Sequence, residues 1–128
     1  MNPKDALGAR KAGASCVPQN VLAEVGLAML EGAAKYGRHN WRTSGARASC
    51  QYDAARRHLD DWWEGQDVDE DPGLSHVTKA IAALIVLRDA MLTDNLIDDR
   101  PPPSVNTAWR NALNQKAEEI LDCHDSNH

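Results

Sequence analysis

The segment from Tyr52 to His76 constrains the fold of this chain most, because it concentrates negative charge between two helical patterns. Between Asp60 and Asp71 it carries seven carboxylates and no lysine or arginine. Like charges at this density repel one another unless they are spread through water or gathered around cations. With His58 before it and His76 after it, such a turn between two helices is suited to binding hard divalent metals. The alternative is a solvated acidic helix end, which the charge pattern alone also permits.

The overall composition limits the classes of function that the sequence supports. The 128 residues predict one domain, and the net charge of -5 argues against a nucleic-acid partner, which needs a basic surface. No apolar run is long enough to span a membrane, and the N-terminus lacks the apolar core of a signal peptide. The odd number of cysteines, none closely paired, indicates a reducing compartment. We therefore expect a cytoplasmic protein.

Apolar residues recur at the spacing of an α-helix in four segments. The expected helices cover 18–36, about 50–64, about 73–93 and about 106–123. In the first of them, the predicted buried stripe consists of Leu22, Val25, Met29, Ala33 and Tyr36. No segment alternates like a strand, and the acidic connector after the second helix is too short and too charged to form one. We predict an all-α fold, a four-helix bundle.

The segments that flank these helices have their own character. Residues 1–17 are small and polar, and they predict a flexible N-terminal arm, or a strap on a neighbour, ahead of a domain at 18–128. Residues 98–104 contain three prolines and predict a stiff spacer before the last helix. The third helix is apolar nearly all the way round, as in IAALIVLRDAML at 81–92. In so small a domain this predicts a second subunit, so we expect at least a homodimer, or a homotetramer.

A cationic loop separates the first two helices. The sequence RHNWRTSGARAS at 38–49 has no apolar period, and Lys35 lies just before it. Trp41 stands among these basic residues, next to Asn40. A tryptophan in such a loop is either a platform on which a nucleobase stacks or a core plug that ties the loop down. The sequence leaves both roles open.

Three blocks of the sequence carry a family resemblance: EGAAKYGRHNWR at 31–42, YDAARRHLDDW at 52–62, and EGQDVDEDPGLSHVTKAIAALIVL at 64–87. The matching positions are Lys35, Tyr36, Gly37, Asn40, Trp41, Asp53, Ala54, Arg57, His58, Gly65, Asp69, Gly73 and His76. Together they resemble a phage-enriched family of dATP/dGTP diphosphohydrolases, a branch of the all-α, MazG-like nucleoside triphosphate pyrophosphohydrolases. Gln66 and Asp71 stand where that family has glutamate. The resemblance spans about 20–93 and leaves out the arm and the last helix.

The resemblance implies a hydrolase with two to three Mg²⁺ or Mn²⁺ ions per site. It would cleave a purine nucleoside triphosphate, preferably dGTP, between the α- and β-phosphates, in the host cytoplasm if phage-encoded. The implied catalytic residues are Lys35, Arg57 and Glu64. The implied substrate-binding residues are Lys35, Asn40, Trp41 and Arg57. The expected metal ligands are Glu31, Asp53, His58, Asp61, Glu64, Asp67, Asp71 and His76. Gln66 is uncharged at a position where the family has glutamate, so Glu64 or Asp67 would supply the missing negative charge.

Two other classes of function stay open. One is a non-catalytic, dimeric helical interaction module whose acidic turn serves solubility. The other is a metal-binding bundle without turnover. Release of pyrophosphate from dGTP in the presence of a divalent metal separates the enzyme from both.

Overall fold

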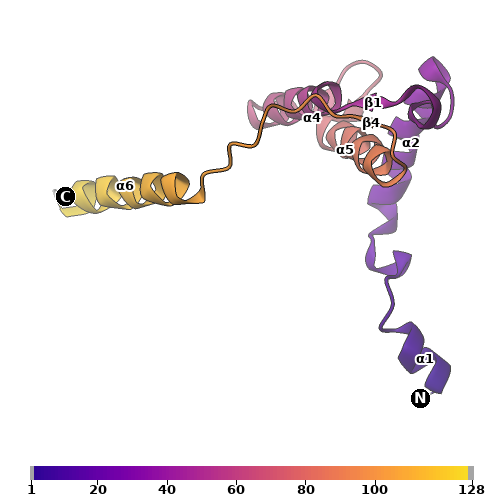
Figure 1. Cartoon of the computed structure of the whole chain (residues 1–128), viewed down its shortest axis with the longest axis horizontal. Coiled ribbons are helices and arrows are strands. Elements are labelled where there is room, and N and C mark those ends of the chain that lie inside the picture. Colours follow the sequence, from indigo (N-terminus) through magenta and orange to yellow (C-terminus); the bar gives the residue numbers. More distant parts are fainter. Residues whose placement is uncertain (1, 127–128) are drawn as a thin grey trace.

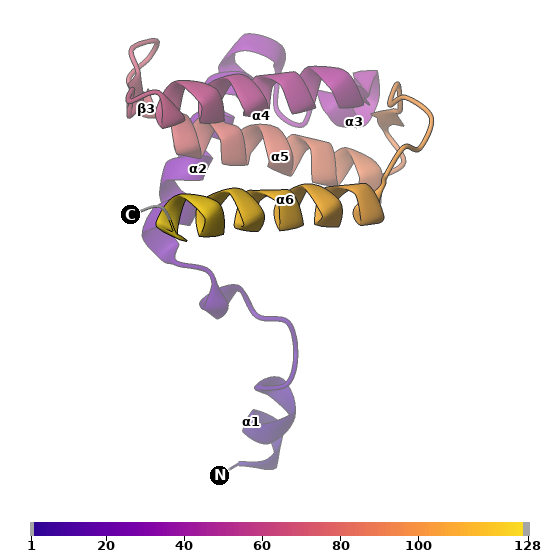
Figure 2. The same ribbon diagram turned by 90° about the vertical axis from the view of Figure 1, so that its left-hand side faces the viewer.

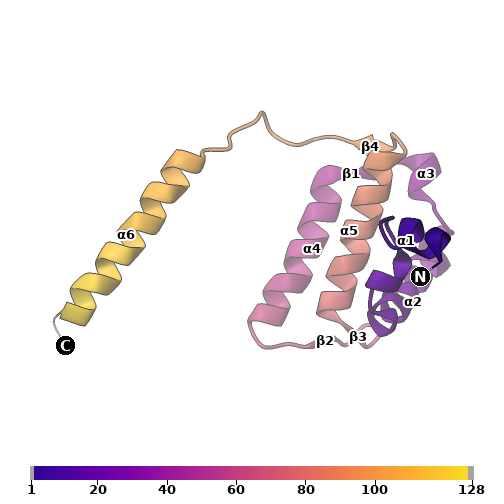
Figure 3. The ribbon, with the colours of Figure 1, turned by 90° about the horizontal axis from the view of Figure 1, so that it is seen from below.

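The computed structural model describes residues 2–126, so Met1 and the last two positions of the predicted domain lie outside it. The all-α prediction is confirmed. Helix α2 (Gln19–Tyr36), α4 (Ala48–Trp63) and α5 (His76–Leu92) form the body, with α5 packed between the other two (Figures 1 and 3). Helices α4 and α5 make a helical hairpin that is closed by the acidic connector. The body therefore consists of a hairpin with α2 on one side.

The helix ends follow from local chemistry. The N–H of Leu22 donates to the carbonyl of Pro18, and Gly37 ends α2 at a φ of 94°, a left-handed conformation that favours glycine. Ser75 caps α5 by accepting a hydrogen bond from the N–H of Val77. These helices therefore lie close to their predicted bounds, and each begins or ends at a residue that favours a terminus.

The prediction that the acidic connector contains no strand is wrong. Strand β2 (Val68–Asp69) pairs antiparallel with β3 (Leu74–Ser75), with Val68 opposite Ser75. Two residues on each side are enough for this short hairpin, and the charge of Asp69 is compensated by a lysine of α5. The expected loop at 38–49 likewise holds the short helix α3 (Trp41–Ser44) and β1 (Ala46–Arg47), which runs parallel to β4 (Leu96–Ile97).

The buried core is small and lies under α3. Trp41, Ala46 and Ala90 form its centre, with Met29, Val86 and Leu96 packed around them. The indole Nε1 of Trp41 donates to Asp89 Oδ2 at 2.7 Å, and Arg42 binds both oxygens of the same carboxylate. These contacts hold the pKa of Asp89 down to about 2, Arg42 first and Trp41 second. Trp41 therefore ties the loop to α5.

The last helix, α6 (Thr107–Ser126), stands apart from the body, although the sequence predicted it as a fourth bundle member (Figures 1 and 2). All of its residues are exposed. The N-terminal arm also extends away, and it carries the short helix α1 (Pro3–Gly8), capped by Asn2, and a 3₁₀ turn at Ala14–Cys16. Helices α2, α4 and α5, with the short α3, therefore pack together, whereas every described residue of α6 is left exposed.

Candidate active site

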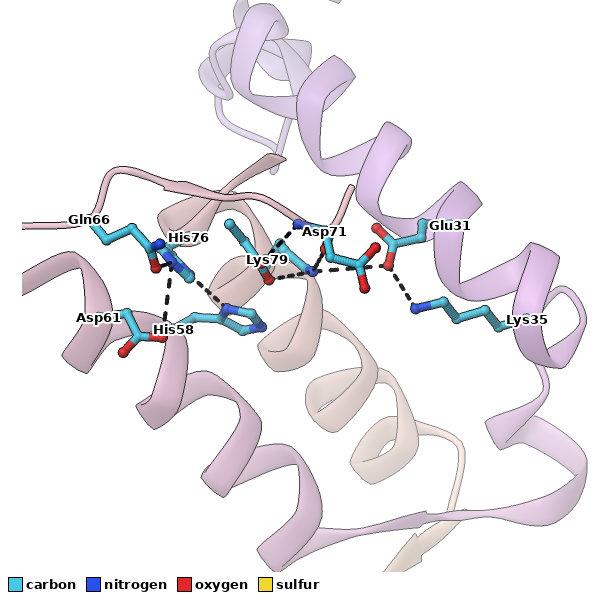
Figure 4. A network of polar contacts seen from close by, with 9 residues as sticks. Glu31, Lys35, His58, Asp61, Gln66, Asp71, His76 and Lys79 are labelled. Carbon is cyan, nitrogen blue, oxygen red and sulfur yellow. Dashed lines mark hydrogen bonds and ion pairs between the residues drawn. The ribbon is translucent and has the colours of Figure 1, made fainter. Parts of the chain in front are cut away.

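Polar side chains from α2, α4, α5 and the β2–β3 hairpin meet at one end of the body (Figure 4). The local fold explains the meeting. The hairpin folds back over the first turn of α5, where the backbone N–H of His76 donates to the carbonyl of Asp67 at 3.0 Å. Gly73 closes the hairpin at a φ of 107°, and its N–H donates to the carbonyl of Asp69. Asp69 is thereby held above α5.

Lys79 lies at the centre of this cluster. Its Nζ is 2.9 Å from Asp69 Oδ2, 3.9 Å from Glu31 Oε1 and 3.0 Å from the carbonyl of Asp71. Its side chain is only 16% exposed, so the ion pair is shielded from bulk water. The hydrogen bond from Lys79 holds the pKa of the Asp69 carboxyl below its usual range. The ammonium thus joins the hairpin to α2 and α5.

Two histidines and one glutamine form a hydrogen-bonded chain beside the lysine. His76 is buried; its Nε2 lies 2.6 Å from Gln66 Oε1, and its Nδ1 lies 2.9 Å from Nδ1 of His58. The glutamine oxygen can only accept, so a neutral His76 donates from Nε2 and accepts at Nδ1. His58 then donates from Nδ1 and keeps a lone pair on Nε2. Burial lowers the pKa of His58, aided by the charge of Lys79 and by His76.

Glu31 on α2 faces the same cluster, and its two carboxylate oxygens differ in their hydrogen bonding. Oε1 accepts from Lys35 Nζ at 3.0 Å, which raises the pKa of Lys35. Oε2 is buried and has no hydrogen-bond partner among the described residues. A buried carboxylate oxygen without a partner is costly in a folded protein. Two helical turns before Glu31, Glu24 accepts a hydrogen bond from the hydroxyl of the buried Thr78 at 2.5 Å.

Two adjoining hollows open between α2 and α5. The smaller, about 140 Å³, is lined by Glu31, Lys35, His58 and Lys79. The larger, about 690 Å³, is lined mainly by small and apolar residues of α2 and α5 and by the loop through Asn40 and Trp41. Both are lined by Ala28, Gly32, Tyr36, Ala82 and Ala83. Small side chains on the facing helices leave this space open, and the result is a cleft with an apolar part and a charged part.

The structure brings some of the expected metal ligands together and keeps others apart. His58 and His76 join Asp69 in a group whose ligand atoms lie within 4.8 Å of one another. Asp61 Oδ2 is 4.0 Å from His76 Nε2, and Asp71 meets the cluster through its backbone. The remaining expected ligands are exposed: Asp53 on α4, Glu64 just after it, and Asp67 before β2.

Three of the four expected substrate-binding residues line the same cleft. Lys35 lines the charged part, and Asn40 and Trp41 line the apolar part. Arg57 is exposed on α4 next to His58, whose pKa its charge helps to lower. The tryptophan is both a core residue and a wall of the cleft, so the two roles that the sequence left open are compatible.

Sequence reasoning missed Lys79, and it left Asp69 out of the expected ligands. Lys79 is the one lysine in the apolar third helix, three residues after His76. A lone lysine in such a helix could have indicated a residue of the site. Gln66 was treated as a lost ligand, whereas its amide oxygen fixes the hydrogen-bonding state of His76. Nothing in the sequence indicated the hydrogen bond between Glu24 on α2 and Thr78 on α5.

Comparison with known proteins bears on this cluster. A family model described as dATP/dGTP diphosphohydrolase, N-terminal, matches residues 1–100, which include every residue of the cleft. No curated protein and no solved structure matches the chain. Among the helices that the structure describes, none is long and apolar enough to cross a membrane.

Proposed function

The chain belongs to the dATP/dGTP diphosphohydrolase family, and from that membership we propose that it hydrolyses purine deoxynucleoside triphosphates, preferably dGTP, in a metal-dependent reaction. A water oxygen forms a bond to the α-phosphorus while the bond from that phosphorus to the bridging oxygen breaks. The products are the nucleoside monophosphate and pyrophosphate. The observation that carries the proposal is the two-part cleft, because a nucleoside triphosphate has an apolar base at one end and a polyanion at the other.

The larger hollow suits the nucleoside. Its volume of about 690 Å³ lies within the range of ligand pockets in proteins. The wall formed by Trp41 offers an aromatic surface for the base, and Asn40 offers an amide that both donates and accepts hydrogen bonds. The triphosphate would then extend into the smaller hollow, where Lys35 and Lys79 supply positive charge. Arg57, which is exposed on α4, would add further positive charge.

The smaller hollow, together with the polar residues beside it, fits divalent metals, two to three per site as expected from the family. Glu31 offers a buried oxygen without a partner, and His58, Asp69 and His76 form a compact group of one oxygen and two nitrogen donors. Carboxylates suit Mg²⁺ and Mn²⁺, whereas imidazoles favour transition metals, so Mn²⁺ fits the mixed set better. Bound there, the metals would neutralise the triphosphate and lower the pKa of the attacking water.

The chain's own groups have separate tasks in this reaction. Gln66 orients His76, and His76 in turn fixes His58 by accepting from its Nδ1, which leaves the Nε2 lone pair of His58 available to a metal. Lys79 and Lys35 hold the phosphate oxygens and offset the charge of Glu31 and Asp69. Glu64, which the family resemblance implies as a catalytic residue, is exposed just after α4 and would act from the solvent side.

The test is a screen of the eight common ribo- and deoxyribonucleoside triphosphates with Mg²⁺ or Mn²⁺, with products separated by chromatography. We expect monophosphate and pyrophosphate in equal amounts, fastest from dGTP. Release of inorganic phosphate with a diphosphate product would contradict cleavage at the α-phosphorus. Tight metal binding without any hydrolysis would favour a metal-binding bundle, and the absence of both would favour an interaction module.

A further inference from the structure

The described chain exposes far more surface than a compact protein of its mass. Its accessible area is 10294 Å², whereas a folded monomer of 14.0 kDa exposes about 6,700 Å². The excess is about 3,600 Å², and a standard protein interface removes only about 800 Å² from each partner. The extended shape in Figure 1 accounts for the difference, because α6 and the N-terminal arm lie away from the body.

One apolar surface lies on the hairpin of α4 and α5, on the side turned away from α2. We call it the outer hairpin face; it consists of Tyr52, Leu59 and Trp63 on α4 and Val77, Leu84 and Met91 on α5, all exposed. Residues seven apart share one side of a helix. Those that face α2 across the cleft, such as Ala54 and Ala82, lie on the roughly opposite side of each helix. The outer face is therefore left uncovered by the body.

The second apolar surface lies on α6. Trp109, Leu113 and Ile120 recur at spacings of four and seven and form one stripe, and all three are exposed. The helix follows a segment that contains Pro101, Pro102 and Pro103, which favours an extended, stiff backbone. The α6 axis runs in nearly the same direction as the axes of α4 and α5, but at a distance from them (Figures 2 and 3).

We infer that two copies of this chain exchange their C-terminal helices, so that the α6 stripe of each copy packs on the outer hairpin face of the other. Each chain carries both apolar surfaces, so a reciprocal exchange between two copies covers the two α6 stripes and the two outer hairpin faces. Such an exchange closes as a two-fold symmetric dimer. The excess area is what an interface of the obligate kind requires. The α6 helix lies beyond the residues that match the family model, so the exchange is independent of the proposed catalytic function.

The first measurement is light scattering on the full chain at micromolar concentration. We expect a mass of twice the single-chain value, or four times if two such dimers associate. Substituting the stripe by L113D together with I120D should yield a monomer whose circular dichroism remains helical, while the charge control Gln115→Glu on the opposite side of α6 should stay dimeric. A wild-type monomer, or a doubly substituted chain that remains a dimer, overturns the exchange.

The second measurement identifies the neighbour of α6 directly. A photocrosslinking residue replaces Leu113. Light and heavy isotope-labelled chains are unfolded, mixed and refolded together. We expect crosslinked peptides from α4 or α5 that combine one light and one heavy chain, because the contact lies between copies. Crosslinks only within one chain would show that α6 folds back on its own hairpin, and crosslinks between copies to other segments would show another mode of assembly. Either result contradicts the exchange.

Discussion

The ammonium of Lys79 on α5 lies 2.9 Å from Oδ2 of Asp69 on β2, inside a cluster expected to hold metals. The same ammonium lies 3.9 Å from Glu31 Oε1. Lys79 therefore acts as a built-in cation that draws two carboxylates together before any metal is bound. This relationship separates the carboxylates that contact Lys79 from those that point into water, and it determines how the site should respond to substitution.

Removing the lysine charge should have opposite effects on stability and on metal binding. Lys79→Met leaves Asp69 and Glu31 to repel each other, so the metal-free protein should lose about 1–3 kcal/mol of stability. Mn²⁺ should bind more tightly, because it no longer competes with the ammonium. Calorimetric titration and thermal unfolding measure both effects, and the exposed ion pair on α6 provides Lys116→Met as the control. Unchanged Mn²⁺ affinity would show that Lys79 lies outside the metal's reach.

Restoring the family's glutamate at position 66 should strengthen the metal site. Gln66→Glu keeps an oxygen that accepts from His76 Nε2 and adds a negative charge near the histidine pair. We expect tighter Mn²⁺ binding, measured by titration. Gln66→Leu removes the acceptor and frees the orientation of His76, so it should weaken Mn²⁺ binding roughly 10- to 100-fold, as outer-shell substitutions do. Equal affinities in both variants would argue against this role.

Sequence patterns predicted the helices well, because the periodic stripe of α2 is visible in one segment alone. The stripe was nevertheless too wide: Val25, Met29 and Ala33 face the body, whereas Leu22 and Tyr36, also predicted to be buried, are exposed. Sequence patterns also indicated an acidic, histidine-flanked group suited to a metal, and the structure brings ligand atoms of His58, Asp69 and His76 within 4.8 Å of one another. They could not predict the Lys79–Asp69 pair, since the β2–β3 hairpin that joins the two residues is only two residues long on each side. The separation of α6 was also invisible, because its stripe fits an intrachain core as well as an intermolecular one.

Trp41 should prove essential for stability, whatever its role in binding. Its indole is buried and hydrogen-bonded to Asp89, so Trp41→Ala should destabilise the fold by about 3–5 kcal/mol. Trp41→Phe keeps an aromatic surface and should cost about 1 kcal/mol for the lost hydrogen bond. Denaturant unfolding measures both. If the base also stacks on this ring, the phenylalanine variant should retain most of the dGTP affinity, and the alanine variant should lose about 1–3 kcal/mol of it at temperatures where it remains folded.

Acid should remove the contribution of Asp89. Its pKa is about 2 in the folded protein, below the ordinary value of 3.8, because Arg42 and Trp41 donate to the carboxylate. A depressed folded pKa adds stability that is complete above about pH 4 and disappears as the pH falls toward 2. The wild type should therefore exceed Asp89→Asn in stability at pH 5–7, and the two should converge near pH 2. Denaturation curves at a series of pH values test this, and a constant difference would contradict it.

The last prediction compares the carboxylates that contact Lys79 with those in water. Glu31 has a buried oxygen without a partner, and Asp69 is held by Lys79, whereas Glu64 and Asp67 are exposed. Glu31→Gln removes charge but keeps the shape, so the metal-free melting temperature should stay equal or rise. At a hundredfold excess over its dissociation constant, a metal that binds only the folded state stabilises the wild type by about 2.7 kcal/mol.

That stabilisation and the hydrolysis should both disappear in Glu31→Gln and in Asp69→Asn. Glu119→Gln on α6 serves as the control for a carboxylate outside the site. Glu64→Gln and Asp67→Asn complete the comparison, because the family resemblance makes them ligands while the structure leaves them in solvent. If these two variants lose the metal response and Glu31→Gln retains it, the metals bind on the outer side of the acidic connector. If monovalent salt at matched ionic strength reproduces the whole stabilisation, the effect is charge screening and no metal site exists.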